Sequence, residues 1–179
     1  MQTKNLSILS FFLLVLLNSC GGSKPISSSP PSEPVTSPSP NPGDGNELLS
    51  AINALRATGC RCGDGERMPA APPLRWSNSL AKAAQNHTED MARNNHFSHT
   101  GTNGSEVGKR AEQAGFNWSA IAENIAKGQQ TSQEVVAEWQ SSHDGHCQNM
   151  MGKEYSDMGM AFVDGAGGRF WTLVLGAPL

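Results

Sequence analysis

The spacing of apolar residues changes from a helical repeat to a strand repeat along this chain, and this change restricts the fold class most strongly. Four segments place apolar residues about 3.6 positions apart, which is the spacing of an amphipathic helix. They are residues 44–59, 76–95, 105–116 and 131–142. Residues 158–163 alternate instead, and a glycine-rich turn joins them to a second strand-like run at 169–176. Helices followed by an antiparallel hairpin predict an α+β domain with helices packed on a sheet.

Capping residues mark where two of the predicted helices begin. Asp44 and Glu47 have the spacing of a capping pair, and Thr131 and Glu134 have the same spacing. In such a pair the first side chain accepts a hydrogen bond from the helix backbone, and the second side chain reaches back. Gly59 suits the end of the first helix because glycine readily adopts the conformation that terminates helices.

The first twenty residues have the pattern of an export signal. Lys4 precedes an apolar run, Leu6–Leu17, which would extend about 18 Å as a helix against roughly 30 Å of hydrocarbon. The run is therefore too short for an ordinary transmembrane helix and is typical of a secretory signal. Its last four residues, Leu-Asn-Ser-Cys, resemble a bacterial lipobox, so we expect Cys20 to be lipidated. The alternative is a plain signal peptide in which Cys20 has no such role.

The next segment, residues 21–45, is rich in proline and serine and has no apolar periodicity. Such a composition cannot form a packed core. We interpret it as a linker that reaches roughly 75 Å if it is fully polyproline II. The sequence thus predicts a signal peptide at 1–20, a linker at 21–45 and one folded domain at 46–179.

Charge excludes one class of partner. The chain has 179 residues, a net charge of −3 and a pI near 5.9. Proteins held by nucleic-acid phosphates need clustered lysine and arginine, and no basic patch is present in this sequence. We therefore expect no nucleic-acid partner.

Three cysteines remain if Cys20 carries lipid, namely Cys60, Cys62 and Cys147. An exported protein meets oxidising conditions, so one disulfide and one free thiol is the simplest expectation. A bond to Cys147 would close a loop of about 85 residues and stabilise the fold by roughly 4 to 5 kcal/mol in the chain-entropy model. Alternatively, the three thiols and His146 could hold zinc, although the paired CxxC spacing of such sites is missing.

Several motifs, in order, resemble one known family. They are AINALRA, APPLRWSNSLAKAAQNHTEDMARNNHFSHTG, AENIAKG, VVAEWQSS, GHCQNMM, DMGMAFV and FWTLVLG. This order is similar to that of the CAP superfamily, also called SCP-like, in its bacterial secreted branch, and it covers nearly all of residues 46–179. The resemblance implies a three-layer α-β-α sandwich. It also favours Cys62, which directly precedes Gly63, as the disulfide partner of Cys147.

The family resemblance also implies a cavity lined by two histidines and two glutamates. The histidine of the FSH motif corresponds to His99, and the glutamate of the AEN motif corresponds to Glu123. The second histidine corresponds to His146. The fourth position departs from the pattern, because Ser142 stands where many eukaryotic members have a glutamate. Of the two histidines in residues 94–101, we expect His99 to face the cavity and His96 to be a replaceable loop residue.

These residue types allow two interpretations of the cavity cluster. Imidazoles from His99 and His146, with a carboxylate, could hold Zn²⁺ and leave a position open for water. We favour the alternative, a buried polar cluster in which Glu123 orients the imidazoles. His87 lies in the apolar stripe of the second helix, so we expect it to be a core histidine with satisfied hydrogen bonds rather than a ligand.

A serine hydrolase is a further enzymatic possibility. Ser98 stands beside His99, and Ser142 stands near His143 and Asp144, which supplies the residue types of a catalytic triad. Neighbours in sequence seldom point at one another, and the chain has no GxSxG nucleophile elbow. This possibility is therefore the least favoured.

The sequence predicts a membrane-anchored or extracellular protein of the cell envelope. By resemblance, it would be a binding module for a hydrophobic ligand, such as a lipid or sterol-like molecule, or for an envelope component. The competing hypothesis is a metal-dependent hydrolase that acts on envelope or extracellular polymers through the His99, Glu123 and His146 cluster.

Overall fold

A computed structural model describes residues 42–65 and 67–179. The predicted signal peptide, the lipidation residue Cys20 and most of the predicted linker lie outside the described residues. Within those residues, no helix combines the length and the apolar character needed to cross a bilayer.

Helices and strands alternate along the described chain. The helices are α1 (Pro42–Thr58), α2 (Asn78–Asn94), α3 (Val107–Gln113), α4 (Ser132–Ser141) and α5 (His146–Met151). The strands are β1 (Cys60–Arg61), β2 (Arg67–Met68), β3 (Arg75–Trp76), β4 (Trp118–Lys127), β5 (Asp157–Gly165) and β6 (Gly168–Pro178).

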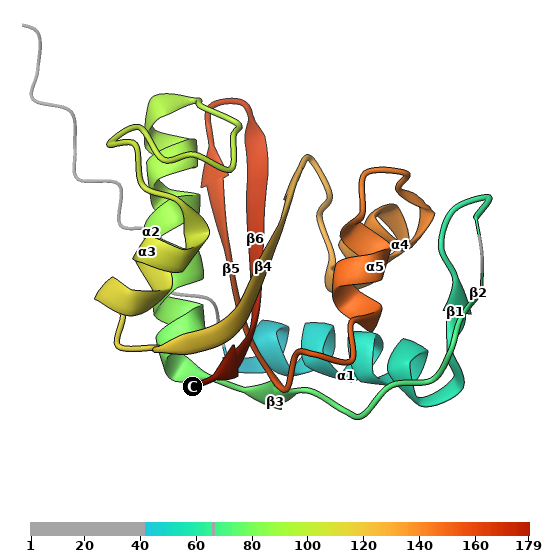
Figure 1. The fold of residues 1–179 in the computed structure, drawn as a ribbon. Coiled ribbons are helices and arrows are strands. Elements are labelled where there is room, and N and C mark those ends of the chain that lie inside the picture. Colours follow the sequence, from blue (N-terminus) through green and yellow to red (C-terminus); the bar gives the residue numbers. More distant parts are fainter. Residues whose placement is uncertain (1–41, 66) are drawn as a thin grey trace, which may run out of the picture. The chain divides into compact units, whose positions relative to one another are not determined.

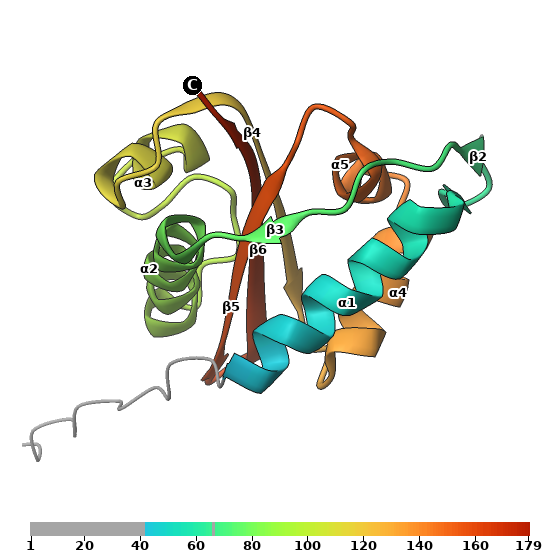
Figure 2. The same ribbon diagram turned by 90° about the horizontal axis from the view of Figure 1, so that it is seen from below.

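The main sheet has four strands in the order β3-β5-β6-β4, and helices cover both of its faces. Strand β3 runs parallel to β5, whereas the β5–β6 and β6–β4 pairs are antiparallel. Helices α2 and α3 lie on one side of the sheet, and α1, α4 and α5 lie on the other, as Figures 1 and 2 show. The α+β class and the three-layer α-β-α sandwich are confirmed.

Alternation along the hairpin strands divides the core into two parts. On β6, Trp171, Leu173 and Leu175 pack with α1 and α4, whereas Val174 packs against α2 on the opposite face. This follows from the two-residue period of a strand. On β5 the large residues share one face and the small ones share the other. A Cβ atom at Gly159 would collide with the backbone of α2, so glycine permits the close approach of that helix.

The predicted helices are present, with changes at their ends. Helix α1 begins at Pro42, so Asp44 lies in its first turn rather than before it. The helix therefore extends into the predicted linker. At α4 one half of the predicted capping box forms, because the Thr131 hydroxyl accepts from the Glu134 N–H at 3.2 Å. The Glu134 carboxylate reaches one residue further back than predicted and accepts from the N–H of Gln130 at 2.7 Å.

Strand β4 and helix α5 are not among the helices and strands that the sequence analysis predicts. The β4 sequence does not alternate cleanly, because residues 123–126 are all buried, with helices on both faces of the strand. Its pairing with β6 joins distant positions, such as Glu123 and Val174. Both missed elements carry residues of the candidate site.

Arg56 connects α1 to the segment that follows α5. Its guanidinium is fully buried and donates to the carbonyls of Met150 at 2.8 Å and Gly152 at 2.9 Å. Further donations reach Pro72 at 2.6 Å and Tyr155 at 3.2 Å. These bonds secure the C-terminal end of α5, the helix that begins at His146.

The disulfide joins Cys62 to Cys147, as the family resemblance predicts, and Cys60 is a buried free thiol. The zinc alternative with all three thiols and His146 is wrong for this structure. Two of the sulfurs are consumed in the disulfide, and the His146 ring contacts Ser142 instead.

Candidate functional site

A cleft of about 640 Å³ lies beside β4, and we call it the β4 cleft. Three stretches line it: the loop after α2, the end of β4 with the turn that follows, and the α4–α5 region. The lining residues are Phe97, Ser98, His99, Ile125, Ala126, Lys127, Gln129, Glu138, Trp139, Ser142, Asp144 and His146. The structure therefore brings His99 and His146 to one cleft although they are 47 positions apart in the sequence.

Glu123 lies behind His99 and is not among the residues that line the β4 cleft. Its side chain is 2% exposed, and its Oε1 atom is 2.9 Å from the Nδ1 atom of His99. Its other oxygen, Oε2, accepts from the Arg110 guanidinium at 2.8 Å. A buried carboxylate needs such partners because an unpaired charge away from water is costly. Glu123 thus acts as a support for the His99 ring.

His99 is half-exposed and lines the β4 cleft. Its hydrogen bond to Glu123 raises the pKa of the imidazole, against the opposing effect of burial. The Nδ1–H group is the donor in that bond when the ring is protonated. The Nε2 atom is on the far side of the ring from Glu123 and makes no hydrogen bond with the described residues.

His146 is held at both its ring and its backbone. Its Nδ1 atom is 2.9 Å from the hydroxyl of Ser142, and its carbonyl accepts from the Asn124 side chain at 2.9 Å. Asn149, one turn further along α5, donates to the same Asn124 side chain at 2.9 Å. Burial lowers the pKa of His146, and the nearby charge of His99 lowers it further.

His87 is a core histidine, as predicted, but only one of its ring nitrogens is satisfied. Its Nε2 atom is 2.9 Å from the carbonyl oxygen of Ser98 and 3.7 Å from a Glu123 oxygen. Its Nδ1 atom is buried without a hydrogen-bond partner among the described residues. Burial lowers the pKa of His87, which favours the neutral ring.

Arg110 is the functional residue that sequence reasoning missed. It is 5% exposed, and besides Glu123 it donates to the carbonyls of His99, at 2.9 Å, and Ser105. The available signal is its place in α3, one turn after Val107, which packs against the core. An arginine within an apolar stripe needs a buried acceptor, and Glu123 is that acceptor.

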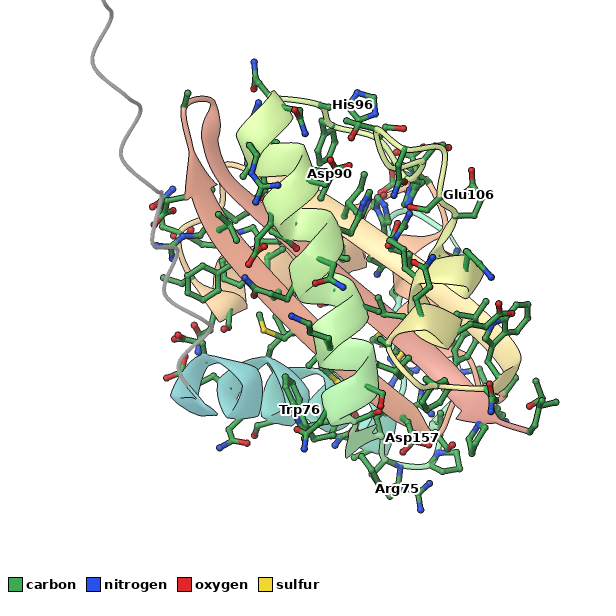
Figure 3. The ribbon with its side chains drawn as sticks, turned by 90° about the vertical axis from the view of Figure 1, so that its left-hand side faces the viewer. Arg75, Trp76, Asp90, His96, Glu106 and Asp157 are labelled. Atoms are coloured by element: carbon green, nitrogen blue, oxygen red, sulfur yellow. A yellow bond between two sulfur atoms is a disulfide. The ribbon has the colours of Figure 1, made fainter. Side chains whose placement is uncertain are left out.

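The loop that carries His99 is fixed to α2 through Asp90. The Asp90 carboxylate accepts from the backbone N–H of Thr102 at 2.8 Å and from its hydroxyl at 2.6 Å. Figure 3 shows Asp90 on α2, with His96 at the end of that helix and Glu106 at the far side of the loop. His96 is a half-buried loop residue whose Nε2 atom is 3.1 Å from the Thr100 carbonyl oxygen.

Neither serine triad that the sequence allows is assembled among the described residues. The Ser98 hydroxyl accepts from the Thr100 N–H at 3.1 Å rather than meeting a histidine. Ser142 contacts His146 instead of His143, whose ring points to Asp64 at 3.9 Å on the surface. The position that departs from the family pattern, Ser142, therefore supports the second cleft histidine.

The donor set for a metal ion in the β4 cleft is incomplete. Among the described residues, the one group of three His, Cys, Asp or Glu side chains with ligand atoms within 4.8 Å of one another is the cysteine trio. Glu123 is engaged by Arg110 and His99. His99 and His146 both use Nδ1 on protein oxygens, which leaves Nε2 for a ligand, as in metal-binding histidines generally.

Comparisons with known proteins show what this chain is similar to. Residues 49–175 match the sequence model of the cysteine-rich secretory protein family, CAP. A curated relative from Bacillus subtilis, the uncharacterized protein YkwD, is 32% identical over 100 residues, which cover 56% of this chain and 38% of the relative. This chain therefore matches little more than a third of that protein.

Two solved structures share the fold. One is an extracellular protein containing an SCP domain from Bacillus anthracis, with a TM-score of 0.61 and 23% identity, covering 75% of this chain and 40% of that one. The other is an outer surface protein from Borrelia burgdorferi, with a TM-score of 0.61 and 17% identity, covering 75% of this chain and 92% of that one. At these identities, the likeness concerns the fold.

Proposed function

Because the chain belongs to the cysteine-rich secretory protein (CAP) family, we propose that it is an envelope-facing binding module that holds an amphipathic ligand in the β4 cleft. The solved relatives described as an extracellular protein and an outer surface protein support a location outside the cytoplasm. The export signal expected at residues 1–20 supports the same location.

The observation that carries this proposal is the mixed lining of the β4 cleft. Phe97, Ile125 and Trp139 supply apolar surface, whereas His99 and His146 bring polar rings to the same space. A wholly apolar ligand would leave the polar groups without partners, which costs free energy. A lipid-like molecule with a polar head would satisfy both kinds of lining. The ligand class is therefore a lipid or another envelope component with an apolar part and a polar group.

Phe97 offers the sharpest test of this proposal. Its side chain lines the cleft and is 49% exposed, and the other large exposed apolar residue of the described chain is Leu179, at 89%. We would titrate a monomeric lysophospholipid into the wild type, Phe97→Ser and Leu179→Ser. Binding should be lost in Phe97→Ser and retained in Leu179→Ser. An absence of binding to the wild type, or equal weakening in both variants, would contradict the proposal.

Anchoring to a membrane is a separate part of the proposal. A lipid on Cys20 and the proline-rich residues that follow it would hold the domain at some distance from the bilayer. Radiolabelled fatty acid should enter the wild type and not Cys20→Ala, and the variant should leave the membrane fraction. Equal labelling of the two proteins would show that Cys20 is not the attachment point.

A second candidate function, a metal-dependent hydrolase, is favoured by the two cleft histidines. The Nε2 atoms of His99 and His146 would hold the ion, and water would have to complete its coordination. A bound zinc would supply Lewis-acid polarisation and a water of lowered pKa for the hydrolysis of envelope polymers. Glu123 would orient His99, and Ser142 would orient His146.

Zinc addition separates the two candidates. A metal held by the cleft should raise the denaturant midpoint of the wild type, because a ligand that binds the folded state stabilises it. His146→Ala should lose this response, and His96→Ala should keep it, since His96 does not line the cleft. A midpoint unaffected by zinc in the wild type would remove the hydrolase candidate and leave the binding module.

A further inference from the structure

Strand β4 forms one edge of the main sheet, and that edge borders the β4 cleft. The strand order is β3-β5-β6-β4, so the sheet pairs β4 with β6 on one side only (Figure 1). Residues 125–127 of β4 line the cleft, and among the described residues none from β6 does so. The opposite walls come from the loop after α2 and from the α4–α5 region. The side of β4 that faces away from β6 is therefore the side that faces the cleft.

The strand register shows which main-chain groups of β4 point to the cleft. In an antiparallel pair, alternate residues direct both N–H and C=O to the partner strand, and the residues between them direct both groups away. The N–H of Gly128 donates to the Arg169 carbonyl of β6 at 2.8 Å, so Gly128 faces β6 and Lys127 faces away. By the same alternation Ile125 faces away, and its carbonyl accepts from the Trp139 indole at 3.2 Å.

Three main-chain groups of this edge make no hydrogen bond with another described residue. They are the N–H of Ile125 and both the N–H and the C=O of Lys127. The same cleft holds a further acceptor, because the Gln129 Oε1 atom is buried and has no hydrogen-bond partner among the described residues. Donors and acceptors two residues apart along a strand are matched by another extended main chain. The headgroup of a simple lipid has no such repeat.

We propose that the β4 cleft binds an acylated peptide whose backbone adds to β4 as a further strand of the sheet. The inference rests on the proposed function, because it uses the same cleft, and it specifies the amphipathic ligand as a lipopeptide. The N–H and C=O of Lys127 exchange hydrogen bonds with one peptide residue. The N–H of Ile125 donates to the carbonyl of the peptide residue two positions further along.

The acyl chain has a place next to the Lys127 end of this edge. Phe97 is half-exposed and lines the cleft, and its ring centroid lies 6.4 Å from that of Phe170. The Lys127 ammonium lies 4.5 Å from the same Phe170 centroid, and the Asn95 side chain accepts from it at 3.1 Å. The apolar ring and the open edge are thus neighbours, so one ligand can contact both.

The short length of the open edge explains why the ligand needs an apolar part. The Trp139 indole already occupies the Ile125 carbonyl, and Glu123, the next residue that faces away from β6, is buried. Only a short peptide segment can therefore pair with β4. A few main-chain hydrogen bonds contribute little net free energy, because water offers the same bonds to the unbound groups. Contact between the acyl chain and Phe97 supplies the rest.

Backbone methylation of the ligand tests the pairing on the full chain. Lauroyl-tetraalanine amide is compared with an analogue in which every alanine nitrogen carries a methyl group, so the acyl chain is the same and the alanine N–H donors are gone. The wild type should bind the analogue about tenfold more weakly or worse. Equal binding of the two would overturn the inference and leave the proposed function intact, because the cleft would then hold the acyl chain without pairing a backbone.

A lysophospholipid separates failure of this inference from failure of the proposed function. If the wild type binds the lysophospholipid but not lauroyl-tetraalanine amide, the lipopeptide inference is wrong and the proposed function stands. If the wild type binds neither, both are wrong.

Two substitutions at one position test the protein side of the pairing. Lys127→Pro removes the outward N–H without taking a donor from the β4–β6 ladder, and Lys127→Ala removes the same side chain but keeps the N–H. Lys127→Pro should bind lauroyl-tetraalanine amide about two- to tenfold more weakly than Lys127→Ala. The two variants should bind the lysophospholipid equally. Equal binding of the lauroyl peptide by the two variants would overturn the inference.

Amide hydrogen exchange of the wild type gives an independent test that needs no folded variant. The N–H groups of Ile125 and Lys127 should exchange more slowly when lauroyl-tetraalanine amide is bound, because each then donates to the peptide. Unchanged exchange at both residues under saturating ligand would overturn the inference even if Lys127→Pro does not fold.

Discussion

Glu123 and Asn124 are consecutive residues of β4, and each of them holds one of the two histidines of the β4 cleft. The Glu123 carboxylate contacts the His99 ring at 2.9 Å, and the Asn124 side chain donates to the His146 carbonyl at 2.9 Å. Their side chains lie on opposite faces of the sheet because strand residues alternate. One strand therefore sets the relative position of two histidines that belong to different helix layers.

Replacing Asn124 should weaken the attachment of α5. Asn124 is fully buried, and Asn124→Ala would remove the side-chain donor to the His146 carbonyl and the acceptor of the Asn149 amide. We expect a loss of about 1 to 3 kcal/mol in the free energy of unfolding. Chemical denaturation measures it, with Asn117→Ala as the exposed control. Equal midpoints for the two variants would contradict the role given to Asn124.

Replacing Arg110 should destabilise the fold more than replacing His99, the other hydrogen-bond partner of the Glu123 side chain. Arg110→Met leaves the buried Glu123 carboxylate without its cation, and breaking a buried pair in this way costs about 3 to 5 kcal/mol. The control is Lys109→Met, because Lys109 is the exposed neighbour, with a side chain 62% exposed.

The double variant Arg110→Met/Glu123→Leu tests whether the loss of stability comes from breaking the Arg110–Glu123 ion pair. Removing both charges should restore part of the stability lost in Arg110→Met, because no uncompensated carboxylate then remains. A double variant that is less stable than Arg110→Met by the full cost of Glu123→Leu alone would show that the two charges do not interact.

Replacing His99 should cost stability mainly at low pH. The folded pKa of His99 is raised by Glu123, so the folded state binds the proton more tightly than the unfolded state. This contribution is fully present below the ordinary histidine pKa of about 6.5 and is lost as the pH rises through the raised value. Chemical denaturation of His99→Ala and His96→Ala, at pH values below and above this pKa range, measures the loss in the free energy of unfolding.

His99→Ala should also be less damaging than Arg110→Met, because Arg110 still pairs with Glu123 after the imidazole is removed. A penalty for His99→Ala that does not change with pH would contradict the coupling between His99 and Glu123. A penalty for His96→Ala equal to that for His99→Ala at low pH would contradict the distinction between the two histidines.

Removing Cys62 alone should not abolish the cross-link. The Sγ atoms of Cys60 and Cys147 are 3.7 Å apart, so Cys62→Ala should form a Cys60–Cys147 disulfide that peptide mapping detects. Cys60→Ala/Cys62→Ala should lose about 4 to 5 kcal/mol, the chain-entropy value for a loop of this length. Free Cys147 in oxidised Cys62→Ala would show that the third cysteine cannot replace the second.

The parts of the fold that rest on local patterns could be predicted from the sequence. The apolar stripes predict α1, α2, α3 and α4, and the alternation of residues 158–163 predicts the β5–β6 hairpin. Strand β4 could not be predicted in this way, because helices bury it on both faces and so remove the period-two pattern. The short helix α5 also lacks enough length for a helical repeat.

The sequence by itself determined the fold class, the motif order of the family and the residues His99, Glu123 and His146 as candidates. Only the tertiary structure decided their roles: Glu123 lies behind His99 and pairs with Arg110, while His146 reaches the cleft from the opposite helix layer. The physical reason is the distance along the sequence over which each kind of interaction acts. Helical and strand periodicity arise between near neighbours, whereas a buried ion pair and a cleft depend on which distant segments the sheet brings together.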